Sequence, residues 1–382
     1  MKALLHQLLF TFLLLLFLGA CTKDDPPAML EIPDDAFLAA LIERGVDKNG
    51  DGEICPCEAE EITSLVLSDH KALKFLLCYG NELSNLDVSG CPALSLLACS
   101  DNPLGTLDLS NNSSLDTLSC GWCQLSALDV SNNPELKWLS CSMNHISELD
   151  LSNNTELGYL DCPSNHSLPT VDLSNNLKLK RLNCTYNSFT RLDVSNNTLL
   201  EWLSCDINQL TSLDISNNTS LVRFGCSQNQ LTSLQVPDNA PLENLRCDYN
   251  QLTSLDVSKL SALVTLKCEN NSITSLDVSN NTELETLYCG DNQLSSLDIS
   301  VNKSLDVLDC SRNPITSLDF SNNLELGTGS WYFIDHIIES IVLSEMPALG
   351  EVCVWTMPFP PEGITVDTTG SPNVYFTTEC SR

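Results

Sequence analysis

Residues 73–89 read LKFLLCYGNELSNLDVS, and the pattern of this segment decides the fold. The pattern L-x-x-L-x-C-x-x-N-x-L-x-x-L-D-V-S returns along most of the chain. Its cysteine recurs every 21 residues, with a single interval of 22, at Cys78, Cys99, Cys120, Cys141, Cys162, Cys184, Cys205, Cys226, Cys247, Cys268, Cys289 and Cys310. A period of this length predicts a solenoid in which every repeat forms one turn.

Each repeat contains a short strand in which inward and outward side chains alternate, so that Leu76 and Cys78 point inward. One repeat cannot bury its apolar side alone, and the repeats therefore stack in parallel. We expect the asparagine column, from Asn81 to Asn313 and broken only by Cys123, to bond backbone groups of neighbouring turns. The prediction is an α/β-type repeat solenoid dominated by short parallel β-strands, a curved slab with a small helical N-terminal cap and a C-terminal β cap.

The register of the repeat resembles that of the leucine-rich-repeat family, in an internalin-like bacterial form with cysteine in place of the third leucine. We place the leucine-rich repeats at 62–325, and degenerate last repeats with the C-terminal cap at 326–382. After Cys310 the spacing predicts Trp331 in the next cysteine position. A last regular unit is expected at 341–354, followed by covering strands at 364–366 and 374–376.

The first twenty residues have the composition of a signal peptide, because an apolar run too short to span a bilayer comfortably follows Lys2. Residues 18–21, LGAC, resemble a bacterial lipobox, which implies that Cys21 is acylated; an ordinary secretory signal is the alternative. Residues 22–25, TKDD, resemble the export signal of surface-exposed Gram-negative lipoproteins. We expect an outer-membrane lipoprotein exposed at the cell surface, with a signal peptide at 1–20 and a flexible tether at 21–33.

A candidate calcium loop precedes the repeats. Residues 47–58, DKNGDGEICPCE, fit D-x-[DN]-x-[DN]-G-x5-E at every specified position and resemble an EF-hand or dockerin-like half. The resemblance implies one structural Ca²⁺ in an N-terminal cap at 34–61, and no other cofactor is required. An acidic turn without metal is the alternative. The expected oxygen ligands are Asp47, Asn49, Asp51, the backbone carbonyl of Glu53, and Glu58.

The cysteines divide into Cys21, the twelve of the column and six others: Cys55, Cys57, Cys91, Cys123, Cys353 and Cys380. The column thiols share one inward position, where cysteine packs as a small apolar residue. An exported, oxidising setting allows disulfides among the other six. We predict that Cys353 pairs with Cys380, which would pin the C-terminal tail to the last repeat.

An acidic column occupies the second half of the repeats. It is broken only by Gln235 and comprises Asp87, Asp108, Asp129, Asp150, Asp172, Asp193, Asp214, Asp256, Asp277, Asp298 and Asp319. We predict a turn ladder in which each carboxylate accepts a backbone N–H group. A calcium-lined edge is the alternative interpretation.

The composition excludes several classes of function. The chain has 18 basic and 50 acidic side chains and a net charge of -32, whereas a nucleic-acid binder needs a basic surface. The sequence contains no phosphate loop, nucleophile elbow or zinc signature, and its histidines form no metal-spaced pair. We therefore expect a monomer that is not an enzyme, has no nucleic-acid partner and meets the membrane through its acyl anchor.

Function is expected in the outward strand positions, because the inward positions pack the core. In the central repeats these positions are rich in aromatic residues and arginine, a composition typical of interfaces; scattered surface aromatics are the alternative. We predict a non-catalytic cell-surface recognition lipoprotein that binds a protein or glycan through the concave face, or alternatively a structural or accessory component of an outer-envelope lipoprotein assembly. The candidate ligand-binding residues are Trp138, Tyr159, Arg181, Trp202, Arg223, Tyr186, Arg246 and Tyr249.

Overall fold

The computed structural model describes residues 63–67, 70–328, 332–333, 336–337 and 341–380 of the chain. Regular structure in these residues consists of short β-strands. Within them, no helix reaches the length and apolar character needed to cross a membrane. The predicted signal peptide, Cys21 with its tether, and the calcium loop with its helical cap lie outside the described residues, so each of them stays a prediction.

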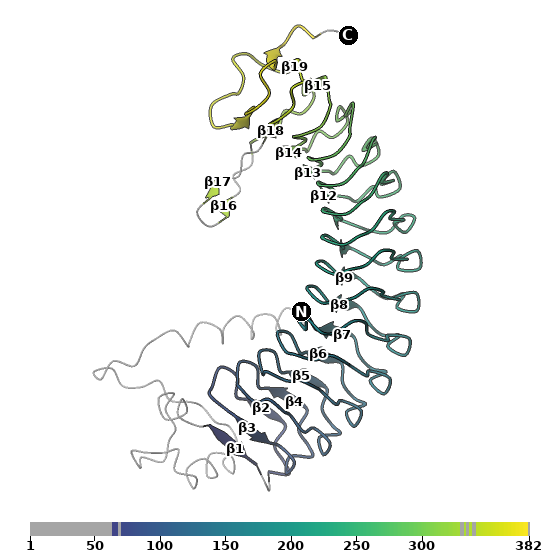
Figure 1. The fold of residues 1–382 in the computed structure, drawn as a ribbon, viewed down its shortest axis with the longest axis vertical. Helices are drawn as coiled ribbons and strands as arrows, with labels where there is room; N and C mark the ends of the chain where they lie inside the picture. Colours follow the sequence, from purple (N-terminus) through teal and green to yellow (C-terminus); the bar gives the residue numbers. More distant parts are fainter. Residues whose placement is uncertain (1–62, 68–69, 329–331, 334–335, 338–340, 381–382) are drawn as a thin grey trace, which may run out of the picture.

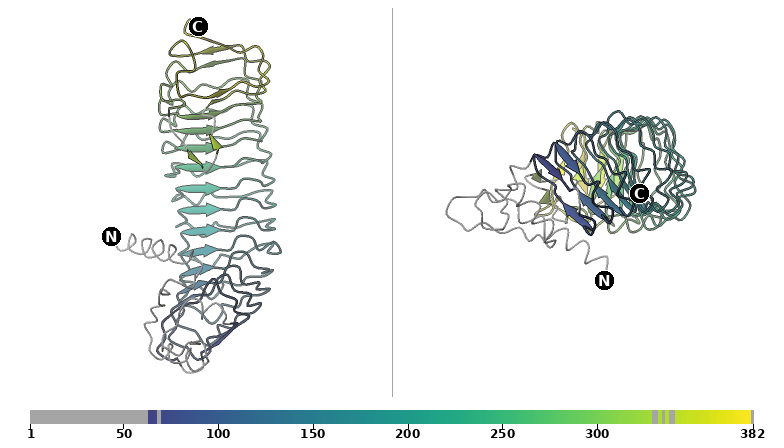
Figure 2. Two further views of the ribbon diagram at one scale, coloured as in Figure 1. Left: turned by 90° about the vertical axis from the view of Figure 1, so that its left-hand side faces the viewer. Right: turned by 90° about the horizontal axis from the view of Figure 1, so that it is seen from below.

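One parallel sheet of 14 strands, the concave sheet, runs the length of the molecule with one strand from each turn. It lines the inner side of an arc in Figure 1, and its strands stack like rungs in Figure 2. The predicted parallel solenoid is confirmed. In spatial order the strands are β2 (Phe75–Leu77), β4 (Leu96–Ala98), β5 (Thr117–Ser119), β6 (Trp138–Ser140), β7 (Tyr159–Asp161), β8 (Arg181–Asn183), β9 (Trp202–Ser204), β10 (Arg223–Gly225), β11 (Asn244–Arg246), β12 (Thr265–Lys267), β13 (Thr286–Tyr288), β14 (Val307–Asp309), β18 (Ile341–Val342) and β20 (Val366–Asp367).

Two smaller parallel sheets form near the ends of the stack, from the second half of the repeat. At one end β1 (Ser64–Val66) pairs with β3 (Asn85–Asp87). At the other end β15 (Ser317–Asp319), β19 (Glu351–Cys353) and β21 (Tyr375–Thr377) pair in that order. Each turn thus returns to the concave sheet through a segment that lies outside it.

The core is filled by the middle residue of each concave strand and by the cysteine that follows the strand. Leu97 and Cys99 of the second concave turn are both fully buried. All twelve column cysteines are free thiols, and only Cys78 in the first concave turn is partly exposed. Burial raises the pKa of the Cys141 thiol to about 12, so this thiol stays protonated at neutral pH and packs as a small apolar group.

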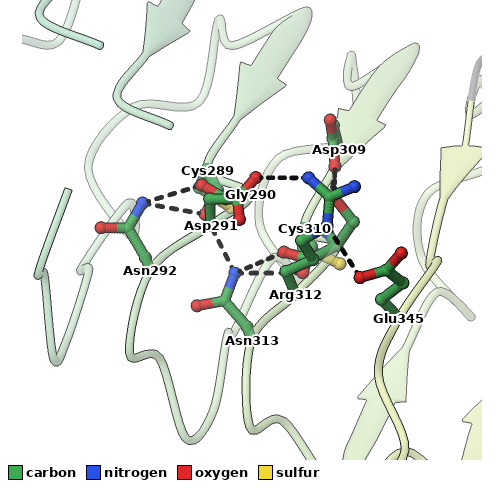
Figure 3. A network of polar contacts seen from close by, with 10 residues as sticks. Cys289, Gly290, Asp291, Asn292, Asp309, Cys310, Arg312, Asn313 and Glu345 are labelled. Carbon is green, nitrogen blue, oxygen red and sulfur yellow. Dashed lines mark hydrogen bonds and ion pairs between the residues drawn. The ribbon is translucent and has the colours of Figure 1, made fainter. Parts of the chain in front are cut away.

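The first asparagine column joins neighbouring turns, as predicted. The Asn102 side-chain amide donates to the carbonyl oxygens of Cys78 (2.8 Å) and Cys99 (2.9 Å), and its Oδ1 accepts the N–H of Leu83 (3.0 Å). Figure 3 shows the same arrangement near the other end, where the Asn313 amide donates to the carbonyl of Cys289 over 3.0 Å. One side chain therefore satisfies backbone groups of two turns.

Cys123 replaces asparagine in this column and keeps two of its hydrogen bonds, to the carbonyls of Cys99 and Gly121. The Cys123 thiol donates to the carbonyl oxygen of Cys99 over 3.2 Å. An asparagine one turn later, Asn144, donates to the equivalent carbonyl of Cys120 over 2.9 Å. The single break in the sequence column is thus a change of donor from amide to thiol.

A second column of buried asparagines lies in the outer part of the turns and has no counterpart among the sequence predictions. The Asn197 amide, for example, donates to the carbonyls of Leu173 (3.1 Å) and Asn176 (3.0 Å). In most turns the signal is the second residue of an Asn-Asn pair. The members are Asn112, Asn133, Asn154, Asn176, Asn197, Asn218, Asn281, Asn302 and Asn323.

The acidic column forms the predicted turn ladder. Oδ1 of Asp193 accepts the N–H of Ser195 over 3.0 Å, and the other ten aspartates make the same contact two residues on. The backbone N–H and hydroxyl of Ser110 hold the pKa of Asp108 below its usual value. Among the residues that the structure describes, no group of three His, Cys, Asp or Glu side chains could hold a metal ion, so a calcium-lined edge has no support there.

The stack continues after Cys310 through a longer turn. Leu308 of β14 pairs with Ile341 of β18, so Leu343 takes the next cysteine position, 33 residues after Cys310. The prediction that Trp331 occupies this position is therefore wrong, because β14 pairs directly with β18; Trp331 itself lies outside the described residues. The segment between β14 and β18 includes the antiparallel hairpin of β16 (Tyr332–Phe333) and β17 (His336–Ile337), which stands on the concave side in Figure 1.

The C-terminal segment adds a further turn to the stack. β18 confirms the regular unit expected from residue 341. β20 and β21, expected as covering strands, instead pair in parallel with β18 and β19. A disulfide joins Cys353 of β19 to Cys380, with their Cα atoms 5.5 Å apart. The last turn is thus tied covalently to the turn before it.

Candidate functional site

The first residues of five consecutive concave strands form one stack, named here the concave ladder. Its members, in register on β6 to β10, are Trp138, Tyr159, Arg181, Trp202 and Arg223. Each precedes a buried strand residue, so strand alternation directs its side chain to the concave side. Neighbouring parallel strands lie about 4.8 Å apart, a spacing that lets planar side chains stack face to face.

The contacts within the concave ladder are continuous. The rings of Trp138 and Tyr159 are stacked with centroids 3.4 Å apart and planes 6° from parallel. The Arg181 Cζ lies 5.1 Å from the Tyr159 centroid and 3.1 Å from the Trp202 centroid. The Arg223 Cζ lies 5.7 Å from the Trp202 centroid on the next strand. The five side chains thus form an alternating aromatic and cationic surface.

This stacking determines which groups remain available to a ligand. Tyr159 lies between Trp138 and Arg181, and Trp202 lies between Arg181 and Arg223, so neighbours occupy both faces of these two rings. Partial burial lowers the pKa of Arg181, although a guanidinium stays charged in proteins. A ligand therefore meets ring edges, the outer face of Trp138 and guanidinium N–H groups.

The third strand positions add charge beside the ladder. Arg246 on β11 is exposed and lies in register with Lys267 on β12, whose Nζ is 4.5 Å from the Tyr288 ring centroid. Toward the other end, Asp161 on β7 accepts the Asn183 amide over 2.8 Å. The free cations of the concave face therefore gather toward β10 to β12.

A second line of exposed side chains runs along the edge where the concave strands end. Every one of its members is in the left-handed backbone region, with φ between 52° and 56°, and each exposes more than a third of its surface. This left-handed column consists of Trp122, Met143, Tyr186, Ile207 and Tyr249. Left-handed backbone favours Gly, Asn or Asp, and equivalent positions in other turns carry Gly80, Asp101 and Asn270.

Beyond the turn of β12 the left-handed positions along the same edge carry charged side chains. Asp291, Arg312 and Glu345 occupy the next left-handed positions, and Arg312 donates to both carboxylates, over 2.8 Å to Asp291 and 3.0 Å to Glu345. Figure 3 shows this bridge between the turns. Because these charges are satisfied within the chain, the apolar surface ends where the ion pairs begin.

Two hollows accompany these lines. One, of about 470 Å³, lies at the N-terminal end of the left-handed column, between Trp122, Met143, His145 and His166. The other, of about 330 Å³, opens in the concave sheet beside Trp202, Arg223 and Arg246. Gly225, at the third position of β10, is one of the residues that line the second hollow.

Asp206, Asp248 and Glu269 follow the ends of β9, β11 and β12. Asp206 is buried and accepts the N–H of Ser227 over 2.8 Å, and the Ser227 hydroxyl donates to Asp248. Burial raises the pKa of Asp206 above its usual value. Burial, followed by the charge of Asp248, raises the pKa of Glu269 to about 7.

The eight predicted binding residues fall on these neighbouring lines. Five make the concave ladder, Arg246 adds a cation beside it, and Tyr186 and Tyr249 belong to the left-handed column. Gly225 and Glu269 were not among the predicted site residues. The available signal for Gly225 was the absence of a side chain at a position where the flanking strands carry Ser204 and Arg246.

The comparisons with known proteins agree with this geometry. A family model described as leucine-rich repeats (2 copies) matches residues 282–324. Among curated proteins, no sequence match to the chain is found. The functional domain of InlJ from Listeria monocytogenes, described as including a cysteine ladder, has 32% identity and a TM-score of 0.63, over 84% of this chain and 75% of that one.

Two further solved structures share the fold at lower identity. An internalin, InlF, from Listeria monocytogenes has 23% identity and a TM-score of 0.56, over 80% of this chain and 98% of that one. A leucine-rich-repeat protein of Leptospira interrogans has 16% identity and a TM-score of 0.54, over 92% of this chain and 100% of that one. Together with the cysteine column and the parallel stack, the likeness to InlJ shows that this chain belongs to the internalin-like family of leucine-rich-repeat proteins.

Proposed function

We propose that this protein is a non-catalytic recognition module that binds a protein ligand through the concave ladder and the left-handed column. The concave ladder is the observation that carries the proposal. It places three aromatic rings and two guanidiniums in one continuous surface, the composition of interface hot spots.

The backbone of the left-handed column supports a binding role. Holding a residue other than Gly, Asn or Asp in this region costs on the order of 1 kcal/mol, and the cost is greater for a β-branched residue such as Ile207. Exposed side chains recover little of this cost by packing. Ligand contact is a reason for placing Trp122, Tyr186 and Tyr249 there, since Gly or Asn would suit the backbone better.

The geometry of the ladder favours a polypeptide ligand over a glycan. A sugar ring stacks on a free aromatic face, and both faces of Tyr159 and Trp202 are already covered. Ring edges and guanidinium N–H groups suit the side chains and carbonyl groups of a protein.

The same proposal includes the location of the molecule. The lipobox-like segment would direct the acylation of Cys21. The acyl chains would hold the protein, as a monomer, on the outer face of the outer membrane of a Gram-negative-type bacterium. The body of the molecule would then stand off the anionic lipid surface, because the chain carries a net charge of -32.

The test is binding of the purified protein to a panel of extracellular-matrix proteins and glycans by surface plasmon resonance. A variant carrying Trp138→Ala, Tyr159→Ala and Trp202→Ala should lose the interaction. The matched control carries Leu177→Ala and Leu199→Ala, which remove exposed apolar side chains outside the concave strands.

Each outcome of this test has a consequence. Binding that the concave variant loses and the control keeps supports the recognition module. Binding that both variants keep places the site elsewhere and contradicts the proposal. Absence of binding to the whole panel favours the alternative, an accessory component of an envelope assembly, which crosslinking in the native cell would identify.

A further inference from the structure

The hollow at Gly225 is built into the concave sheet. Gly225 lies between Ser204 on β9 and Arg246 on β11 in the strand register. A Cβ atom at Gly225 would meet the carboxylate oxygens of Asp206 at 2.8 and 2.9 Å. The Asp206 carboxylate therefore excludes a side chain at Gly225, and the glycine is one of the residues that line a recess of about 330 Å³.

Two guanidiniums at this recess make no direct ion pair with any described residue, although the charge of Arg246 acts on the nearby Asp206 carboxyl. Within the part of the chain that the structure describes, neither Arg223 nor Arg246 makes a side-chain hydrogen bond or an ion pair. Other cations of this chain are paired, among them Lys178 with Glu156 and Arg312 with Asp291. In a chain with 50 acidic side chains, two arginines on one recess that have no directly bonded carboxylate provide a site for an external anion.

The nearby carboxylates do not fill this role. The Asp206 carboxylate takes the place that a Cβ atom of Gly225 would occupy, accepts the Ser227 N–H, and interacts with the charge of Arg246 without a direct ion pair. Glu243 lines the recess and is exposed, but it makes no ion pair with either arginine. Arg181 adds a third cation two strands from Arg223, across the Trp202 ring. Three arginines therefore outnumber the two carboxylates near the recess.

We infer that this recess binds the carboxylate of an aspartate or glutamate side chain in an acidic segment of the protein ligand. Arg223 and Arg246 donate to the carboxylate oxygens, and the Trp202 edge packs against the adjoining methylene groups. This inference rests on the proposed function and specifies the chemistry of the ligand. An acidic polypeptide also fits the covered ring faces, which leave little surface for a sugar ring.

The probe is a fluorescently labelled hexaglutamate peptide, measured by anisotropy with the purified protein. Ionic strength near 0.15 M, where the Debye length is about 8 Å, screens the acidic surfaces outside the recess. We expect saturable binding, no binding of hexaglutamine, and at least a tenfold loss of affinity in Arg223→Gln with Arg246→Gln. The charge-matched control, Arg191→Gln with Lys303→Gln, changes exposed cations outside the concave strands and should bind as the parent does.

Each result decides between stated alternatives. Hexaglutamate that does not bind, or that binds the recess variant as tightly as the parent, overturns the inference. If oligogalacturonate binds more tightly than hexaglutamate, and the recess variant no longer binds it, the occupant is an anionic glycan. This result would contradict the peptide assignment. Suppose that a matrix protein no longer binds the variant without the aromatic side chains but still binds the variant without Arg223 and Arg246. The proposed function then stands, and only this inference is removed.

Discussion

The guanidinium carbon of Arg181 lies 3.1 Å from the centroid of the Trp202 ring, the closest cation–π contact in the part of the chain that the structure describes. The contact connects Trp202 to the stacked pair of Trp138 and Tyr159, because Tyr159 lies on the other side of Arg181. Arg181 is therefore held by neighbours on both sides before any ligand arrives, and binding would cost little side-chain entropy.

This contact predicts measurable coupling between Arg181 and Trp202. In a double-mutant cycle of Arg181→Ala and Trp202→Ala, we expect a coupling free energy of about 1 kcal/mol in urea unfolding. The matched pair Arg191→Ala and Trp202→Ala should show none, since no ring contact joins them. Additive effects in the first cycle would show that the stack contributes nothing to stability.

Replacing a residue of the left-handed column is predicted to maintain or raise stability while lowering ligand affinity. Tyr249→Asn places a residue that tolerates left-handed backbone at a position with φ of 52°, so we expect unfolding stability to be unchanged or to rise by about 1 kcal/mol. Affinity for any ligand found in the panel should fall. A Tyr249→Asn protein that is clearly less stable would mean that the tyrosine serves packing.

Replacing a residue of the first asparagine column is predicted to lower the free energy of unfolding substantially. Asn229→Ala removes an amide that donates to the carbonyls of Cys205 and Cys226 and an oxygen that accepts the N–H of Leu210. Leaving such groups buried and unpaired should destabilise the protein by about 2–4 kcal/mol. The neighbouring exposed Gln230→Ala is the control. Equal denaturation midpoints for the two variants would contradict a bridging role.

Replacing Glu269 with a neutral residue is predicted to raise the stability of the protein by an amount that depends on pH. The folded pKa is about 7 against an ordinary value of 4.5, raised first by burial and then by Asp248 and Asp309, with Lys267 opposing. The folded state therefore binds a proton that the unfolded state has lost, and stability falls as pH rises from about 4.5 to 7. Glu269→Gln should melt higher than the parent at pH 8 and alike at pH 4.5. A gain of equal size at both pH values would contradict the titration.

The Cys353–Cys380 disulfide predicts selective loosening of one end. Cys380→Ser opens a covalent loop of 27 residues, for which the chain-entropy model gives about 3 kcal/mol. Limited proteolysis should then cut first within residues 355–380, while the melting of the central turns changes little, because each turn contacts mainly its neighbours. Cleavage at unchanged rate and place would show that the disulfide carries no such constraint.

The sequence predicts the periodic features well because each residue type performs one task in every turn. Cys99, Asn102 and Asp108 lie where the register places them, and their contacts repeat along the stack. Interruptions are less accessible: the repeat spacing predicts Trp331 in the cysteine position after Cys310, whereas the structure has Leu343 there, although the apolar pattern does locate the unit that starts at Ile341. The exclusion of a side chain at Gly225 depends on the carboxylate of Asp206, a contact between turns that spacing alone does not reveal.

The aspartate column has a further consequence for how a ligand approaches. It gives the outer part of nearly every turn one carboxylate, and hydrogen bonds keep these groups ionised, as at Asp193. The central concave strands, β8 to β12, carry Arg181, Arg223, Arg246 and Lys267 and no acidic residue. The arc is thus an electric dipole directed across its width. An acidic partner is repelled by the back and drawn to the front, so it is oriented before contact, and the association rate should fall as salt is added.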